Sequence, residues 1–339
     1  MTRWSALLLL LAFQMPASYG MAAETGADYP KFRIPLDCTI NKDCWVINYF
    51  DHATDDGIVD FTGGDNLYNR HQGVDFAIPN MADMAQGVRV LAAADGKVTA
   101  LRDHIPDIGS VTRDGQRIEN PMCGNAVLID HGNSLRTLYC HLRRGSISVA
   151  VGDMVKAGDP IGLVGLSGFT NFPHVHLAVS IGEEKVDPFV GPGWKPGGDV
   201  AAKPMWREDV LESLTYQPFV LMDAGFTGGT FSKHGLLSGW FSRPTVPSTA
   251  RHLSFSALVY YADAGDVIDM KILDPDGNTV AAETTTLTDG FQRHWRDIKT
   301  SRPETGWKSG QYRGIVVVTR PGGGEPYSQS LSKMIEFGP

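Results

Sequence analysis

Three short segments of the sequence combine a histidine with a carboxylate or with a second histidine. The segment NRHQGVDFAIP contains His71 and Asp75, TLYCHL contains His141, and FPHVHLAVS contains His174 and His176. A lone histidine is more often a structural residue than a ligand, so the inference rests on the joint occurrence of the three motifs in strand-like surroundings. Two histidines and one carboxylate are the usual protein ligands of a catalytic zinc, which keeps its fourth position for water.

Strand geometry indicates how two of these motifs present their side chains. Alternation along HVHLAVS places His174 and His176 on one face, roughly 6–7 Å apart, so that one can bind a metal while the other reaches a substrate. The same rule places Thr137, Tyr139 and His141 on one face, which we expect to point at the same cleft.

The first motif requires a change of chain direction. If His71 and Asp75 bind one ion, the segment between them cannot be a straight strand, because four extended residues span about 13 Å. Gly73 is the residue that permits the chain to turn there.

The motifs also limit which catalytic mechanisms are possible. A bound ion lowers the pKa of its water and polarises a peptide carbonyl, but a general base is still needed. The sequence contains no H-E-x-x-H, which excludes the glutamate-based mechanism associated with that motif. Two histidines beyond the ligand set can exchange protons near neutral pH and fill the remaining roles.

The surrounding sequence predicts an all-β chain. From Phe61 onward, short apolar runs such as GVDFAI, AVLID and HVHLAVSI alternate with turn residues, and 102–122 reads as an inserted polar loop. A Pro/Gly-rich stretch near 190–205 marks a domain boundary. Beyond it, alternating runs such as LSFSALVYYA and QYRGIVVVTRPG predict a β-sandwich.

The N-terminus predicts export. A cationic start at Arg3 is followed by an apolar run to Phe13, then by small residues before the first acidic residue, Glu24. This is the order of a secretory signal peptide, and cleavage after Gly20, Ala22 or Ala23 fits it. No later segment has the length of a transmembrane helix, so we expect none in the mature chain.

Four cysteines in an exported chain predict two disulfides, Cys38–Cys44 and Cys123–Cys140. For the second pair, a two-residue turn at 131–132 sets the cysteines opposite each other. A turn at 132–133 slips the register by two and keeps them on one face. The absence of C-x-x-C argues against zinc binding by these cysteines. A formal net charge of −8 argues against a nucleic-acid partner.

Taken together, several segments resemble the lysostaphin-like (LytM-type) zinc endopeptidases of bacterial cell wall. The resemblance covers about 61–190 and is carried, in the family's order, by His71 to Asp75, DGKVTAL, LIDHGNSLRTLYCHL, VAVGDMVKAGDPIGLVGLSG and PHVHLAVS. It implies that zinc is bound by His71, Asp75 and His176, and that His141 and His174 are catalytic residues that do not bind the metal. Two departures are the insertion at 102–122 and NFPHVH, where a small-residue tGpHLH is commoner.

We therefore expect a zinc-dependent endopeptidase that acts on peptidoglycan stem peptides or cross-bridges, in the periplasm or outside the cell. The alternatives are a non-catalytic wall-binding or amidase-regulating scaffold and a broader secreted metalloprotease; oligomeric state is left open. The expected order is a signal peptide (1–22), a lead-in (23–58), an antiparallel β-sheet LytM-type peptidase domain (59–195), a linker (196–209) and an accessory β-sandwich (210–339). Because every chemical motif precedes the linker, the sandwich is expected to be dispensable for bond cleavage.

Overall fold

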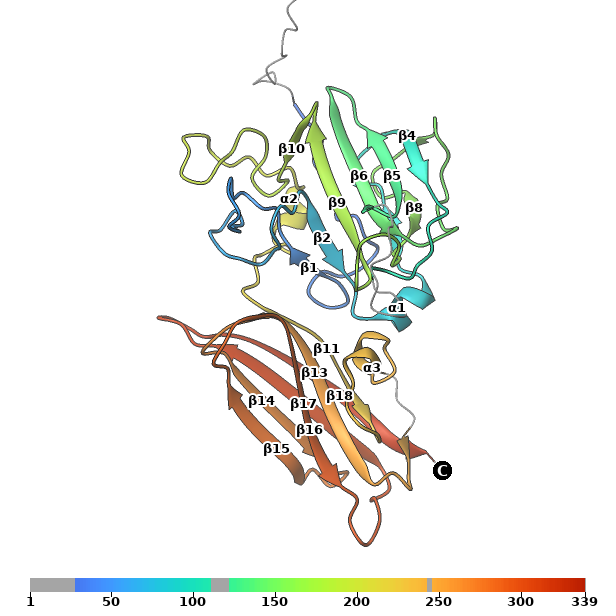
Figure 1. Ribbon diagram of the computed structural model, residues 1–339, viewed down its shortest axis with the longest axis vertical. Coiled ribbons are helices and arrows are strands. Elements are labelled where there is room, and N and C mark those ends of the chain that lie inside the picture. Colours follow the sequence, from blue (N-terminus) through green and yellow to red (C-terminus); the bar gives the residue numbers. More distant parts are fainter. Residues whose placement is uncertain (1–27, 111–121, 243–245, 339) are drawn as a thin grey trace, which may run out of the picture.

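The computed structural model describes residues 28–110, 122–242 and 246–338, which form two β-rich regions (Figure 1). The predicted signal peptide and most of the polar insertion at 102–122 lie outside these residues. No helix among the described residues is both long enough and apolar enough to cross a membrane.

The first region is built on an eight-stranded antiparallel sheet. Its strands follow the order β1-β2-β9-β6-β5-β4-β7, with β10 also paired to β9. Their bounds are β1 (Trp45–Asn48), β2 (Val74–Ala77), β4 (Gly96–Arg102), β5 (Asn125–Asp130), β6 (Leu135–Leu142), β7 (Met154–Val155), β9 (His174–Ile181) and β10 (Glu184–Val186). A two-stranded sheet of β3 (Arg89–Leu91) and β8 (Pro160–Leu163) and the short helices α1 (Met81–Gln86) and α2 (Glu208–Leu211) complete this region.

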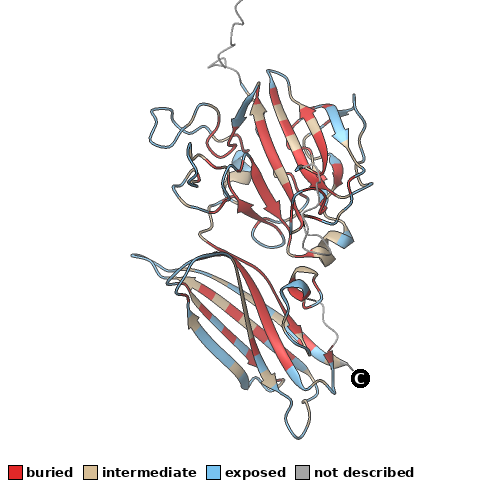
Figure 2. Ribbon diagram, viewed as in Figure 1, coloured by how far each residue is buried: buried red, intermediate tan, exposed pale blue. Residues whose placement is uncertain are grey.

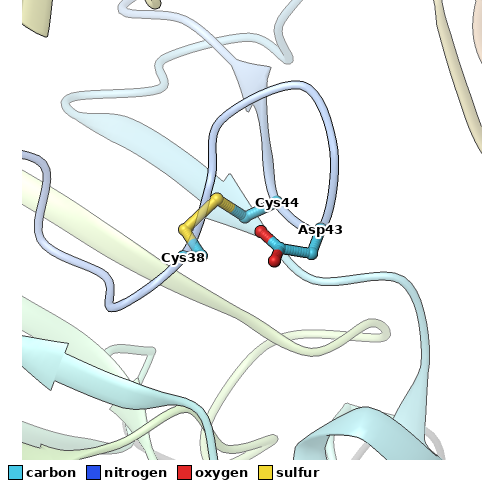
Figure 3. A group of neighbouring side chains, drawn as sticks. All are labelled: Cys38, Asp43 and Cys44. Atoms are coloured by element: carbon cyan, nitrogen blue, oxygen red, sulfur yellow. A yellow bond between two sulfur atoms is a disulfide. The ribbon is translucent and has the colours of Figure 1, made fainter.

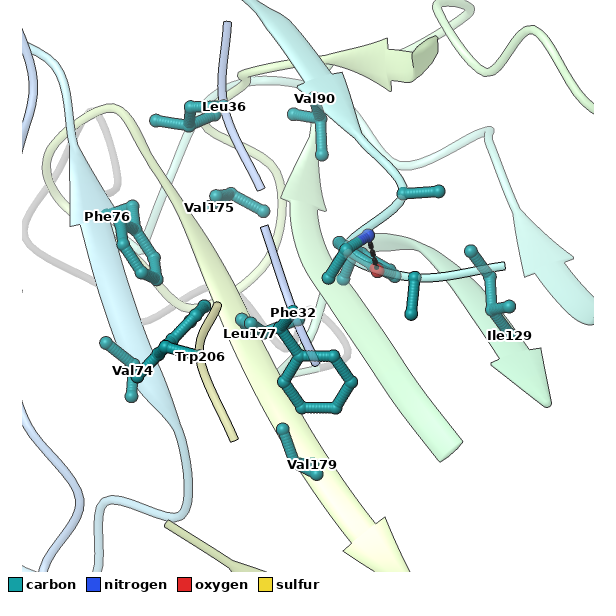
Figure 4. Packing of buried hydrophobic residues seen from close by; sticks show 14 of the residues in the cluster. Phe32, Leu36, Val74, Phe76, Val90, Ile129, Val175, Leu177, Val179 and Trp206 are labelled. Carbon is teal, nitrogen blue, oxygen red and sulfur yellow. Dashed lines mark hydrogen bonds between the residues drawn. The ribbon is translucent and has the colours of Figure 1, made fainter. Parts of the chain in front are cut away.

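One face of the large sheet covers a dry core. Along β9, Val175, Leu177 and Val179 enter this core, while the histidines between them face the other way, as strand alternation predicts. Figure 4 shows these side chains together with Phe32 and Trp206, which come from well outside the predicted peptidase domain. The core side of the sheet therefore holds β9 in place, and its other side is free to carry polar groups.

The second region consists of two sheets that share a core, so the predicted all-β architecture is confirmed in both regions. One sheet has the order β11-β13-β16 and the other β12-β18-β17-β14-β15. The bounds are β11 (Val220–Thr227), α3 (Lys233–Leu237), β12 (Val246–Pro247), β13 (His252–Ala262), β14 (Val267–Leu273), β15 (Thr279–Thr286), β16 (Phe291–Ser301), β17 (Gln311–Arg320) and β18 (Tyr327–Gly338). Buried and exposed residues alternate along several of these strands, as along β14 and β17 (Figure 2).

The expected lead-in over 23–58 is part of the first core. Phe32 and Leu36 are buried there, and β1 forms the edge of the large sheet beside β2. At the other end, Trp206 and Leu214 also belong to this core. The apolar run WVINYF contains β1, which is buried on both faces, so its apolar residues do not alternate with polar ones.

The structure joins Cys38 to Cys44 and Cys123 to Cys140, the two pairings predicted from the sequence. The predicted register of the second hairpin is wrong. Strands β5 and β6 are joined by four residues, 131–134, and Leu128 pairs with Leu138. A β-bulge near Asn125 changes the spacing again, so local turn chemistry alone could not fix the register.

Candidate metal centre

Three side chains bring ligand atoms together on the open face of the large sheet. Asp75 on β2 lies directly opposite His176 on β9, and His176 Nδ1 is 2.8 Å from Asp75 Oδ1. His71 Nε2 lies 3.1 Å from the same carboxylate oxygen and 3.0 Å from His176 Nδ1. The three ligand atoms all fall within 4.8 Å of one another. Two imidazole nitrogens and one carboxylate oxygen so placed fit a zinc ion.

The chain reaches this arrangement by a turn just before His71. Arg70 has φ of 63°, in the left-handed region, and β2 begins only at Val74. The chain also bends at Gly73, as predicted, and a Cβ atom there would lie 2.5 Å from His176 Cε1 and 2.6 Å from its Nε2. Glycine is required for the close approach of the His176 ring to the backbone.

Burial and opposite charge act against each other at the ligands. Burial lowers the pKa of His71, but the neighbouring Asp75 carboxylate and the hydrogen bond to the Tyr49 carbonyl outweigh it and raise that pKa. Burial raises the pKa of Asp75, but His71 and His174, with hydrogen bonds from the imidazoles, hold it well below its usual range. Asp75 is therefore a carboxylate, the form that binds metal.

Two further histidines stand beside the ligands. The rings of His141 and His174 are 4.6 Å apart between centroids, and His174 Nε2 lies 3.6 Å from Asp75 Oδ1. Burial lowers the pKa of His141 to about 3, helped by its histidine neighbours His174 and His176, and burial also lowers the pKa of His174. Both imidazoles are neutral near pH 7 and can accept a proton.

The predicted face of β6 is wrong. Tyr139 lies in the core opposite Leu177, and its hydroxyl oxygen accepts hydrogen bonds from Ala93 N and from the Thr137 hydroxyl. His141 reaches the metal centre because its φ of 63° breaks the alternation and turns the side chain over. The pattern of apolar and polar residues along a strand cannot predict that a non-glycine residue adopts this left-handed conformation.

Among the described residues, a second group of possible ligand atoms is formed by Cys38, Asp43 and Cys44 (Figure 3). The two sulfur atoms are joined in a disulfide, so they are not available as thiolate ligands. This agrees with the expectation that the cysteines do not bind zinc.

Sequence reasoning missed the groups that orient the ligands. The Tyr49 carbonyl accepts a 2.6 Å hydrogen bond from His71 Nδ1, which directs Nε2 at the centre. Asn48 Nδ2 donates a 2.6 Å hydrogen bond to Asp75 Oδ2, which leaves Oδ1 for the metal. The available signal was an asparagine inside the apolar run WVINYF, since a polar residue at a buried strand position needs a partner.

Residues 69–188 match the sequence model of Peptidase family M23. This match agrees with the resemblance to lysostaphin-like (LytM-type) enzymes and covers about the same part of the chain. The DD-endopeptidase ShyB of Vibrio cholerae, named as acting on peptidoglycan, is 33% identical over 117 residues, covering 34% of this chain and 22% of ShyB. The DD-carboxypeptidase/endopeptidase Mpg of Neisseria meningitidis is 36% identical over 36% of this chain and 23% of Mpg.

The chain thus spans about a quarter of the length of these curated relatives. Among solved structures, a zinc-containing peptidase from Vibrio cholerae is 28% identical with a TM-score of 0.33, covering 47% of this chain and 39% of that one. The catalytic domain of lysostaphin from Staphylococcus simulans is 25% identical with a TM-score of 0.27, covering 42% of this chain and 85% of that domain.

Proposed function

We propose that this protein is a zinc-dependent endopeptidase that hydrolyses peptide bonds in peptidoglycan stem peptides or cross-bridges. The observation that carries the proposal is the convergence of the His71, Asp75 and His176 ligand atoms beside two buried, neutral histidines, within a segment that matches family M23. The names of the relatives support the reaction type, since ShyB and Mpg are both described as endopeptidases, and the name of ShyB supports peptidoglycan as the substrate class.

In this proposal His71 Nε2, Asp75 Oδ1 and His176 Nδ1 hold the zinc. When bound, the ion supplies a Lewis acid for the peptide carbonyl and lowers the pKa of a water molecule. The set leaves room for such a water, because three protein ligands are the number found in catalytic rather than structural zinc sites.

His141 and His174 handle protons. His141 Nδ1 donates to the Ser167 carbonyl at 2.8 Å, and His174 Nδ1 donates to the Phe172 carbonyl at 3.0 Å. A carbonyl only accepts, so Nδ1 of each ring carries the proton and Nε2 keeps a lone pair. One ring takes a proton from the attacking water, and once protonated it delivers that proton to the leaving amine.

We also propose that the protein acts outside the cytoplasm, in the periplasm or after release. Two disulfides and the expected signal peptide support an oxidising compartment. Cell-wall peptidoglycan is the proposed partner there, and the net charge of −8 gives no basis for nucleic-acid binding.

The test is digestion of purified sacculi followed by mass spectrometry of the released fragments. We expect about one zinc per chain, fragments cut at a peptide bond, and activity that is abolished by a chelator and restored by zinc. Chelated protein restored with Mg²⁺ is the control, since that ion prefers oxygen ligands.

Two outcomes favour the alternatives. Tight binding to sacculi with no fragment released identifies a scaffold. Equal cleavage of sacculi and of an unfolded protein such as reduced casein identifies a broader metalloprotease. Absence of bound metal after zinc reconstitution overturns the metal assignment itself.

A further inference from the structure

The C-terminal region contacts the first region beside the metal centre, on the same face of the large sheet. Strand β1 contacts β11, and Trp45 and Ile47 of β1 pack in one buried cluster with Met222 and Leu258. A polar contact accompanies it, in which Asn80 Nδ2 donates to Asp223 Oδ2 at 2.8 Å. The two regions therefore share a dry, specific interface.

A chain of hydrogen bonds crosses this interface and ends on a metal ligand. Asn48 Nδ2 donates to Asp75 Oδ2 at 2.6 Å, and the Tyr261 hydroxyl donates to Asn48 Oδ1. The directions are fixed, because a carboxylate only accepts, which leaves the amide oxygen to receive the tyrosine hydroxyl. Gln292 Nε2 in turn donates to the Tyr261 oxygen at 3.3 Å. Asn48 and Asp75 are almost completely buried, so water does not compete for these bonds.

Two irregularities of the backbone make this series of hydrogen bonds possible. A register shift between Val46 and Asn48 places Asn48 opposite Asp75. On the other side, Tyr261 has φ of 57°, a conformation that costs a bulky residue free energy.

The effect of that conformation is visible in the packing of β13. The odd-numbered residues up to Val259 face the core of the second region, and Leu258 and Tyr260 face the first region. Tyr261 breaks the alternation and joins the side of Tyr260, while Ala262 returns to the core. Arg320 holds the irregular backbone by donating from Nη2 to the Tyr261 carbonyl at 2.8 Å.

The neighbouring residue of β13 supports a catalytic histidine. The Phe172 ring stacks on His174, with centroids 4.3 Å apart and planes 18° apart. Tyr260 packs against Phe172 at 5.8 Å, and the Arg293 guanidinium lies 6.0 Å from the Phe172 ring centre.

We propose that Tyr261 is a positioning residue for the metal centre, which acts through Asn48 to hold Asp75 with Oδ1 toward His71 and His176. The inference rests on the proposed zinc site. It makes the C-terminal region a structural part of that site, contrary to the expectation that it is dispensable.

The test uses the full chain with Tyr261→Phe, which removes only the hydroxyl, and Asn48→Ala. The matched control is Tyr312→Phe, since Tyr312 is buried in the same region and its hydroxyl accepts from Lys308 N, away from the metal. Zinc affinity is measured by competition with a chromophoric chelator, and the visible spectrum of the Co²⁺-loaded protein reports the arrangement of ligands. We expect Asn48→Ala to weaken zinc binding about 10- to 100-fold and Tyr261→Phe about 10-fold, each with an altered Co²⁺ spectrum.

A zinc affinity and Co²⁺ spectrum of Tyr261→Phe equal to those of the parent overturn the proposal. So does an equal change in Tyr312→Phe, which indicates a general effect of destabilising the region. Cleavage is measured separately: if the parent binds zinc but cuts no wall peptide, the proposed function fails, and the affinity comparison still decides the role of Tyr261.

Discussion

Three of the site's four histidines have their protons fixed by backbone carbonyls. The Nδ1 atoms of His71, His141 and His174 donate to the carbonyls of Tyr49, Ser167 and Phe172, which leaves each Nε2 with its lone pair. His176 is the exception, because its Nδ1 faces Asp75 and His71. The direction of each ring, more than its residue type, separates the proposed ligands from the proposed proton carriers.

Substitution of single histidines tests this division. We expect His71→Ala and His176→Ala to lose both zinc and activity, since each removes one of three protein ligands. His141→Ala and His174→Ala are expected to keep zinc and to lose about 10²–10⁴-fold in turnover, the range for a general acid–base group. Zinc content and wall-peptide cleavage are measured on all four variants, with circular dichroism as the folding control. Loss of zinc from His174→Ala with retention by His176→Ala reverses the two roles.

Gly73 provides a test of packing at the ligand. A Cβ atom there meets the His176 ring at 2.5 Å and the Leu177 carbonyl at 2.7 Å, so the ring must move or the strands must separate. We expect Gly73→Ala to lower zinc affinity and to destabilise the fold by about 1–3 kcal/mol, the usual cost of overpacking. Gly323→Ala is the control, because nothing lies within 4 Å of a Cβ at that position. Thermal unfolding and chelator competition that give the parent's values for Gly73→Ala contradict this account.

At the scale of elements, two strands depart from regular alternation next to the proposed metal centre. His141 in β6 and Tyr261 in β13 both have positive φ. Each side chain therefore lies on the opposite face of the sheet from the one that regular alternation predicts. Both changes bring a polar group toward the metal centre. Strain of this kind persists only where the surrounding structure holds it, and here Arg320 and the Cys123 carbonyl bind the neighbouring backbone.

These departures explain what the sequence could and could not predict. Alternation along β9 correctly separates the core residues from His174 and His176, because the pairing of β9 with β2 and with Leu135–Cys140 of β6 has no register shift. It fails at His141, where the conformation depends on contacts distant in sequence. It gives no indication of Asn48, whose partner Tyr261 is 213 positions away. Local patterns therefore predicted the all-β fold and brought the candidate residues together, while the support of the site came from tertiary contacts.

The Cys123–Cys140 disulfide supports the end of β6 on which His141 lies. His141 N donates to the Cys123 carbonyl at 2.9 Å, so both cysteines of the bridge hold the backbone where it enters the histidine. We expect Cys123→Ala/Cys140→Ala to lose about 3 kcal/mol of stability by loop-closure entropy and to lose turnover as well. Cys38→Ala/Cys44→Ala is the control, because its shorter loop predicts about 2.4 kcal/mol and its backbone bond goes from Asn41 N to the Cys44 carbonyl, not to His141. Equal turnover in the two double variants, measured well below their unfolding temperatures, contradicts a role for the bridge at the site.

At the scale of the whole molecule, β1 connects the two regions. Val46 belongs to the core of the first region, whereas Trp45 and Ile47 belong to the cluster shared with the C-terminal strands. The same short strand carries Asn48, which binds Asp75 on one side and Tyr261 on the other. A change in the contact between the regions must therefore reach the metal ligand through the backbone of β1.

This connection predicts that opening the interface impairs catalysis even when both regions stay folded. Met222 is buried in the shared cluster, so Met222→Glu places a charge there that has no partner and forces the regions apart. Met334, on β18, is 62% exposed, so Met334→Glu is the matched control with the same change of charge. We expect Met222→Glu to lose at least about tenfold in wall-peptide cleavage and in zinc affinity, as loss of an outer-shell partner does, while Met334→Glu resembles the parent. Proteolysis and circular dichroism establish that each region remains folded. If Met222→Glu is folded and opened at the interface yet cleaves at the parent rate, the C-terminal region is dispensable for bond cleavage, as the position of the sequence motifs first indicated.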